Sequence, residues 1–237
     1  MEISFRSDMT VELVKHVASD ADVIWAARVS TKGESSLADL SSDPSRSAGL
    51  INFLMRDRHG TPFEHSSMTF YVRAPIFVFR EFMRHRTFSY NEESGRYREL
   101  EPEFYVPGPE RKLVQIGKAG RYDFVDGTPE QHKLVTEATR ESCRRAYAAY
   151  REMLEAGVAR EVARTVLPVG LYSSMYATCN ARALMNFLSL RTRHDDAAYP
   201  SFPQREIELV AEAMEREWAA IMPLTHAAFE SNGRVAP

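Results

Sequence analysis

Met68-Thr69-Phe70-Tyr71-Val72-Arg73-Ala74-Pro75 is the stretch of sequence that decides the fold class. Its first, third and fifth residues are apolar and alternate with less apolar ones. This period of two predicts a strand with one buried face. Pro75 breaks the strand and suits the first position of a helix, which we expect to run to about Arg86. The chain therefore mixes strands and helices.

Helical spacing of apolar residues predicts further helices on both sides of this stretch. They are expected at residues 12–30, 45–58, 129–157, 160–167, 180–191 and 203–222. Asp20 is a possible capping residue at which the first of them restarts. Residues 33–47 are expected to be a mobile loop, residues 98–127 to be irregular, and residues 171–178 to form a second strand. Because helices outnumber strands and no regular βα units appear, we expect an α+β fold and not a doubly wound parallel sheet.

Composition excludes several classes of protein. The length of 237 residues allows one large domain or two small ones, and the formal net charge of −3 gives no general reason to expect nucleic acid or an anionic membrane as a partner. No apolar run reaches about 18 residues, and no signal-like segment opens the chain. Cys143 and Cys179 form neither a metal spacing nor a disulfide framework, which favours a reducing cytoplasm. For His194-Asp195-Asp196, a solvated loop is preferred to a metal site.

Positive charge is concentrated locally. Between residues 80 and 98 five arginines stand against three acids: Arg80, Arg84, Arg86, Arg96 and Arg98 against Glu81, Glu92 and Glu93. Guanidinium is the side chain best matched to phosphate oxygens, so this cluster suits a small anionic ligand better than a long polyanion. Arg80 and Arg84 would share one face of the expected helix. Ser94-Gly95-Arg96 could form an anion nest, because glycine allows positive φ and close backbone approach.

Arg191 has an unusual place on the expected helix 180–191. At 100° per residue it lies about 180° from Arg182, in the middle of the apolar arc, whereas Asn186 shares the polar arc with Arg182. A cation at such a position extends beyond the helix end, interacts with the C-terminal dipole, or meets a ligand in a half-buried pocket. These three alternatives stay open from the geometry alone.

The segment Arg84-His85-Arg86-Thr87-Phe88-Ser89-Tyr90-Asn91-Glu92-Glu93-Ser94-Gly95-Arg96 fills every fixed position of the pattern RHRxxSxNxxSxR. The chain thereby resembles the flavin-dependent thymidylate synthases. Seven fixed positions at fixed spacing should not coincide by chance. Residues 61–65, 161–168 and 180–191 resemble three further blocks of the same family.

The resemblance implies a reaction and a set of binding residues. Members methylate dUMP to dTMP, with methylenetetrahydrofolate as the carbon donor and FAD reduced by NADPH as the hydride source. The resemblance assigns dUMP contacts to Glu81, Arg84, Glu92, Glu93, Ser94, Gly95, Arg96, Arg164 and Arg191. It assigns flavin contacts to Thr61, Arg84, His85, Arg86, Glu92, Asn180, Arg182 and Asn186. Arg191 would be catalytic, because it matches the arginine thought to stabilise an ionised N3 of the uracil ring, and His65 would be structural.

The resemblance also implies an architecture. We expect a single, helix-rich domain over residues 1–237, with a central, mostly antiparallel sheet packed with long helices. The expected assembly is a homotetramer with active sites shared between subunits.

Absent motifs narrow the chemistry. None of the eleven glycines forms a GxG pair, so a flavin would be held by arginines and backbone amides, without a Rossmann fingerprint or a P-loop. Neither cysteine follows proline, as the nucleophile of the other type of thymidylate synthase usually does, and Ser94 has no identifiable base. Two other classes stay open. One is an RNA-binding module that stacks bases on aromatic side chains, and the other is a regulatory protein that binds a nucleotide without chemistry.

Overall fold

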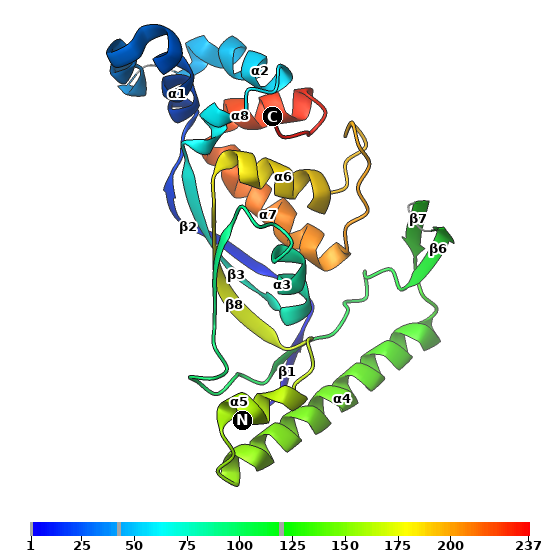
Figure 1. Ribbon diagram of the computed structural model, residues 1–237. Helices are drawn as coiled ribbons and strands as arrows, with labels where there is room; N and C mark the ends of the chain where they lie inside the picture. Colours follow the sequence, from blue (N-terminus) through cyan, green and yellow to red (C-terminus); the bar gives the residue numbers. More distant parts are fainter. Residues whose placement is uncertain (1, 42–43, 119–120) are drawn as a thin grey trace. The chain divides into compact units, whose positions relative to one another are not determined.

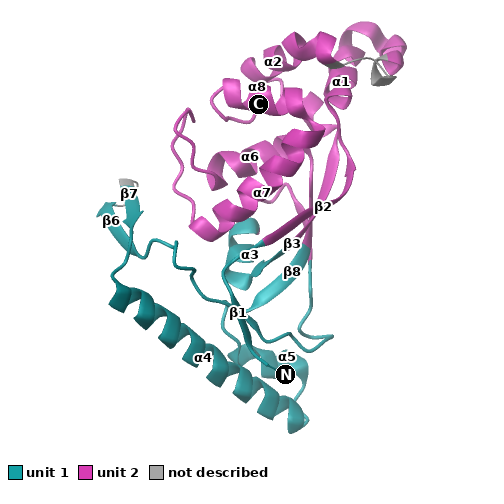
Figure 2. Cartoon of the chain, turned by 180° about the vertical axis from the view of Figure 1, so that it is seen from behind, with its two compact units in different colours: residues 1–9, 73–82, 92–175 teal, residues 10–72, 83–91, 176–237 magenta. Residues whose placement is uncertain are grey.

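The computed structural model describes residues 2–41, 44–118 and 121–237 (Figure 1). The chain forms two compact units (Figure 2). Unit 1 consists of residues 1–9, 73–82 and 92–175, and unit 2 of residues 10–72, 83–91 and 176–237. The expectation of one domain over 1–237 stays a prediction.

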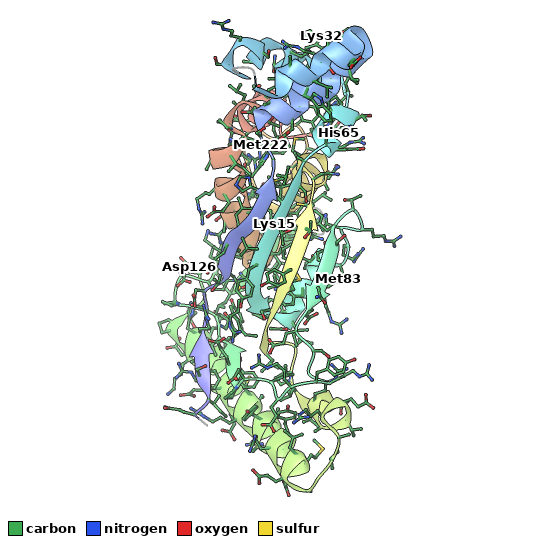
Figure 3. The ribbon with its side chains drawn as sticks, turned by 90° about the vertical axis from the view of Figure 1, so that its left-hand side faces the viewer. Lys15, Lys32, His65, Met83, Asp126 and Met222 are labelled. Carbon is green, nitrogen blue, oxygen red and sulfur yellow. The ribbon has the colours of Figure 1, made fainter. Side chains whose placement is uncertain are left out.

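A four-stranded antiparallel sheet confirms the expected α+β class. Its strand order is β2 (Thr10–Val17), β3 (Ser67–Pro75), β8 (Tyr172–Cys179) and β4 (Ser89–Glu92). Figure 3 shows these strands next to one another, with Lys15 on the edge strand β2. The apolar residues of β3 predicted to face inward, Met68, Phe70 and Val72, are fully buried. The alternating stretch 68–75 therefore belongs to a central strand of the sheet.

Unit 1 is built around one long helix, α4 (Pro129–Glu155). A capping box between Thr128 and Gln131 starts this helix, and the helix buries Cys143, Tyr147 and Tyr150 against the rest of the unit. Shorter helices are α3 (Ile76–Phe82) and α5 (Arg160–Ala163), which the 3₁₀ turn η4 (Arg164–Val166) follows. The predictions for 129–157 and 160–167 are confirmed.

For residues 98–127 the sequence predicts irregular structure with short extended pieces such as Phe104-Tyr105-Val106. The extended piece is confirmed as β5 (Glu103–Tyr105), which pairs in parallel with β1 (Ser4–Arg6). The irregular interpretation is wrong where β6 (Val114–Lys118) and β7 (Arg121–Val125) form an antiparallel pair. These strands are short, and turn-forming residues flank them, so composition hides them. The partner of β5 also lies about a hundred residues away in sequence, where no local pattern can predict it.

Unit 2 is mainly helical. Its helices are α1 (Asp20–Lys32), α2 (Ala48–Arg56), α6 (Ala181–Arg191), α7 (Arg205–Ile221) and α8 (Pro223–Ser231). Helix α7 contacts β2, α6 and α8 (Figure 1). Its Trp218 is fully buried. The predictions for helices at 45–58, 180–191 and 203–222 are confirmed. In the described part of the chain, no helix combines the length and apolarity that crossing a bilayer requires.

Two other predictions in unit 2 need correction. The expected helix 12–30 is instead the strand β2 followed by the helix α1. The spacing of Val and Leu in this segment fits a strand as well as a helix, and pairing with β3 stabilises the strand. The expected mobile loop 33–47 contains two 3₁₀ segments, η1 (Gly33–Ser41) and η2 (Pro44–Ser47), with residues 42–43 outside the described residues.

Asp20 stands at the first position of α1 but does not cap that helix. Its buried carboxylate accepts hydrogen bonds from the backbone N–H groups of Leu224 and Thr225, both at 2.9 Å, and from the Thr225 hydroxyl at 2.6 Å. These are donors at the start of α8, where a negative charge also meets the positive end of the helix dipole. Asp20 therefore joins two helices about two hundred residues apart.

We predict that Asp20→Ala lowers the free energy of unfolding by about 2–3 kcal/mol, because it removes a cap and leaves the buried Thr225 hydroxyl without its acceptor. Urea denaturation measures the change. Asp22→Ala is the matched control, since Asp22 lies in the same helical turn and accepts a hydrogen bond from Ser19. Equal effects of the two substitutions would contradict the assigned role of Asp20.

Candidate functional site

In unit 1 the end of the signature forms a compact turn at Ser94. The backbone N–H groups of Tyr97 and Arg98 donate to the Ser94 carbonyl at 3.0 and 3.3 Å, and the Arg96 N–H donates to the Ser94 hydroxyl at 3.3 Å. Gly95 is buried at the centre of the turn. The turn thus places a hydroxyl and two arginines within five residues.

Gly95 is required by space and not by its φ angle. It is absent from the residues with positive φ, so that part of the anion-nest expectation is wrong. A Cβ atom at this position would lie 2.8 Å from Leu100 Cδ1 and 3.2 Å from Arg164 Cδ. Close approach, the other part of the expectation, is confirmed, and it brings Arg164 of η4 against the signature turn.

Carboxylates tie this turn to the rest of unit 1. Arg96 Nε contacts Glu161 of α5 at 2.9 Å, and Arg98 Nε contacts Glu93 at 3.1 Å. Glu93 in turn accepts from the Ser174 hydroxyl of β8 at 3.3 Å, and its N–H donates to the Ser174 carbonyl at 2.8 Å. Two of the arginines are therefore held in place by ion pairs.

Glu92 lies beside the other two arginines of this cluster. The residue is exposed as a whole, but desolvation of its carboxyl group raises the pKa, and the nearby Glu93 charge acts in the same direction. A hydrogen bond from Ser173 and the charges of Arg164 and Arg80 oppose this rise. Neither arginine has a hydrogen-bonded carboxylate among the described residues, so the cluster keeps positive charge that its own acids do not take up.

Sequence reasoning missed one residue of this cluster and undervalued another. Ser173 was not singled out, although a pair of hydroxyls in a buried strand was a usable signal. Arg80 lies outside the signature, yet it shares the surroundings of Glu92 with Arg164. Glu81 is half-buried on α3.

The N-terminus of α6 gathers the flavin candidates of unit 2. Asn180 caps the helix, because its side-chain oxygen accepts from the Ala183 N–H at 2.8 Å. Arg182 Nε donates to the Pro237 carbonyl at 2.6 Å, and a side chain at Gly60 would collide with the Arg182 guanidinium. Asn186 donates to the Arg182 carbonyl at 3.1 Å and is exposed. These hydrogen bonds therefore fix the orientations of the side chains at the start of α6.

Arg191 ends α6 and meets His85 of the signature. Arg191 Nε donates to His85 Nε2 at 3.0 Å, so the imidazole accepts through Nε2 and carries its proton on Nδ1. The His85 ring packs edge-on against Phe187 at 4.8 Å between centroids. Burial, together with the charges of Arg191 and Arg84, lowers the pKa of His85 to about 4. At neutral pH a neutral imidazole thus orients this guanidinium.

The remaining candidates of unit 2 are Thr61, Arg84 and Arg86. Arg84 and Arg86 are exposed, and neither has a carboxylate partner among the described residues. Thr61 is exposed at the start of the 3₁₀ turn η3 (Thr61–Glu64). The expected helix through Arg84 is wrong: α3 ends at Phe82, so Arg80 and Arg84 do not share a helix face and belong to different units. His65 packs edge-on against Trp25 at 5.8 Å between ring centroids, as a structural residue would.

Comparison with known proteins decides the family. A family model described as thymidylate synthase complementing protein matches residues 12–224. A flavin-dependent thymidylate synthase of Streptomyces avermitilis is 72% identical over 235 residues, which cover 99% of this chain and 96% of the relative. One of Tropheryma whipplei is 60% identical over 237 residues, covering 100% and 98%.

The chain belongs to the flavin-dependent thymidylate synthase family. It is therefore an enzyme of that family, and the resemblance drawn from the arginine signature is confirmed. Among solved structures, a UMP/dUMP methylase PolB from Streptomyces cacaoi bound with 5-Br UMP is 56% identical, with a TM-score of 0.91 and both chains covered in full. The same methylase bound with 5-Br dUMP is 57% identical, with a TM-score of 0.93 over 99% of this chain and 100% of that one.

One side-chain group in the described residues of this family member has the spacing of a metal site. It comprises Glu215, His226 and Glu230. Burial acts to raise the pKa of Glu215, but hydrogen bonds from His226 and Arg234 outweigh it and lower the pKa to about 2. Arg234 binds both Glu215 oxygens at 2.7 Å, so its guanidinium already stands where a cation would. The residues 194–196 are all exposed and are not part of this group.

Both cysteines are free and buried. Desolvation raises the pKa of the Cys143 thiol and of the Cys179 thiol. Buried thiols with raised pKa values are poor nucleophiles, because the thiolate is the reactive form.

We predict that His85 makes the enzyme less stable in acid. Its folded-state pKa of about 4 lies below the ordinary value of 6.5, so below pH 6.5 the unfolded chain binds a proton that the folded chain refuses. This contributes a loss of roughly 2 kcal/mol between pH 7.5 and pH 5. His85→Gln should reduce that loss, as measured by urea denaturation at both values. An equal loss in the variant and the natural protein would contradict a neutral His85.

Proposed function

We propose that the enzyme methylates dUMP at C5 to give dTMP, with methylenetetrahydrofolate as the carbon donor and NADPH-reduced FAD as the hydride source. The observation that carries the proposal is the arginine cluster around Glu92 in unit 1. Arg80 and Arg164 lie near that carboxylate without a hydrogen-bonded acid, while Arg96 and Arg98 are held by acids of the same unit. Such residual positive charge fits a phosphate dianion.

The dUMP phosphate is bound by Ser94, Gly95, Arg96 and Arg164, with Glu92 and Glu93 beside them. Glu81, Arg84 and Arg191 are the other dUMP contacts that we propose. Ser94 is a binding residue, because its hydroxyl accepts a hydrogen bond from the Arg96 N–H and contacts no side chain in the described residues that could act as its base. We propose that Glu92 contacts the flavin as well as the nucleotide.

The residues of unit 2 fit a flavin by their chemistry. Arg84 and Arg86 offer exposed guanidinium groups, and Asn186 offers an exposed amide, which suit phosphate oxygens and the polar edges of a flavin ring. Thr61, His85, Asn180 and Arg182 complete the proposed flavin contacts. When bound, the flavin supplies the hydride that reduces the transferred carbon to a methyl group.

Arg191 is the catalytic residue in this proposal. Uracil C5 becomes nucleophilic when negative charge builds on the ring, and a fixed guanidinium at the N3/O2 edge stabilises that charge. His85 holds Arg191 through Nε without adding a negative charge, since its imidazole is neutral. A carboxylate in its place would offset the charge that the uracil ring needs.

A cysteine nucleophile has no part in this reaction. The burial and raised pKa values of Cys143 and Cys179 support this. Free buried thiols also suit a reducing cytoplasm, where we place the reaction. We further propose that the enzyme is a homotetramer with active sites shared between subunits, and a single domain over residues 1–237.

A second candidate substrate comes from the comparison with PolB. That protein is described as a UMP/dUMP methylase, and it is 56% identical to this chain. UMP differs from dUMP only by the 2′-hydroxyl, so a small change beside the sugar decides between them. Methylation of UMP is therefore measured together with methylation of dUMP.

We predict that the purified protein carries a flavin absorbance spectrum and that NADPH reduces the flavin anaerobically, faster with dUMP than with UMP. Addition of methylenetetrahydrofolate should then yield dTMP. A colourless protein whose RNA affinity falls steeply with salt would favour the RNA-binding alternative. Binding of dUMP without any NADPH oxidation would favour a regulatory protein, and equal turnover of UMP would extend the substrate class.

We predict that Arg191→Ala keeps bound flavin but lowers the turnover of dUMP by a factor of about 10²–10³, as loss of one fixed charge-stabilising donor does. Flavin absorbance and dTMP formation are measured on the same sample. Arg216→Ala, an exposed arginine on α7 in the same unit, is the control and should keep normal turnover. Near-normal turnover of Arg191→Ala would remove its catalytic role.

A further inference from the structure

Unit 1 contains a pocket of about 630 Å³ that lies apart from every residue assigned to the nucleotide or the flavin. It is lined by the end of β1, by the loop that follows β5 and by the first half of α4, which all belong to the teal unit of Figure 2. Pockets of this size accommodate drug-sized ligands. None of the proposed dUMP or flavin contacts is among its lining residues.

One guanidinium group without an acid partner lines this pocket, and a second lies over the same phenylalanine ring outside the lining. Arg140 lines the pocket and lies 5.3 Å above the Phe5 ring, and Arg144, one helical turn further on, lies 5.5 Å above the same ring. Neither has a hydrogen bond or ion pair with any residue in the described ranges. Like charges four residues apart on a helix repel each other unless something compensates them. A bound anion would supply that compensation.

The other charged groups of the lining leave the pocket positive. Arg6 already forms ion pairs with Asp8 at 2.6 Å and with Glu103 at 3.1 Å, so its charge is neutralised within the protein. Lys133 approaches Glu137, the one acid of the lining, only at 3.9 Å, and both side chains are exposed. Lys133 and Arg140 therefore remain available to an anion.

The rest of the lining is apolar or carries hydroxyls. Phe5, Val106 and Pro107 offer a surface on which a flat ring can lie, and Thr136 offers a hydroxyl beside the cations. A free inorganic anion would leave this apolar surface unused. A ligand with both a phosphate group and a planar ring uses both parts of the pocket.

We propose that this pocket binds a small organic phosphate with a planar ring, such as a mononucleotide, with the phosphate at Arg140 and Lys133 and the ring against Phe5. The site belongs to unit 1 alone, and it does not rest on the proposed function. It takes a ligand that is distinct from the methylated substrate.

The test is calorimetric titration of the flavin-loaded protein, saturated with dUMP and FAD so that both assigned sites are filled, with adenosine 5′-monophosphate as the probe. We expect the probe to bind saturably. Adenosine, which lacks the phosphate, should bind with an affinity at least about tenfold lower. Arg140→Gln and Lys133→Gln should each weaken binding of the probe severalfold or more. Arg145→Gln is the matched control, because Arg145 is exposed on α4, pairs with Glu141 at 2.6 Å and does not line the pocket.

Absence of saturable binding to the natural protein would overturn the proposal. So would equal binding by Arg140→Gln, Lys133→Gln and Arg145→Gln. Turnover of dUMP is measured separately on each variant and is expected to stay normal. A failure of that turnover in the natural protein would count against the proposed function and not against this pocket.

Discussion

Repulsion between arginines is the constraint on which the signature region depends. Arg80, Arg96, Arg98 and Arg164 all belong to unit 1 near the Ser94 turn, and the unit places Glu92, Glu93 and Glu161 among them. Two of these acids also connect further elements: Glu161 comes from α5, and Glu93 accepts a hydrogen bond from Ser174 of β8. The acids therefore position Arg96 and Arg98, while Arg80 and Arg164 have no hydrogen-bonded acid among the described residues and leave positive charge beside Glu92, which suits recognition of a phosphate.

Unit 2 also contains an arginine whose position depends on a neighbouring side chain. His85 orients Arg191 with a neutral ring, and aromatic neighbours keep that ring buried. Acids thus position Arg96 and Arg98 in unit 1, and an imidazole contacts Arg191, the arginine to which we assign the chemistry. Glycine serves both units by allowing close approach, at Gly95 to Arg164 and at Gly60 to Arg182.

Sequence predicted what is encoded locally and missed what depends on distant partners. The alternation in β3 and the helix at 129–157 were predicted from the sequence, and the arginine signature identified the family before any comparison. The parallel pairing of β1 with β5 and the capping of α8 by Asp20 join residues that are far apart in the chain, so no window of sequence contains both partners. The end of α3 at Phe82 was missed because the residues that follow, Met83 to Arg86, include neither glycine nor proline to mark a helix end. The roles of individual site residues follow from the family pattern and stay predictions.

The central claim is that the arginine cluster around Ser94 receives the phosphate of a pyrimidine nucleotide. A crystal structure of the flavin-loaded protein with dUMP tests it most directly. The account predicts phosphate oxygens within about 2.7–3.2 Å of the Ser94 hydroxyl and of the Arg96 and Arg164 guanidinium groups. A nucleotide bound elsewhere, with these three side chains in contact only with protein and water, would contradict it.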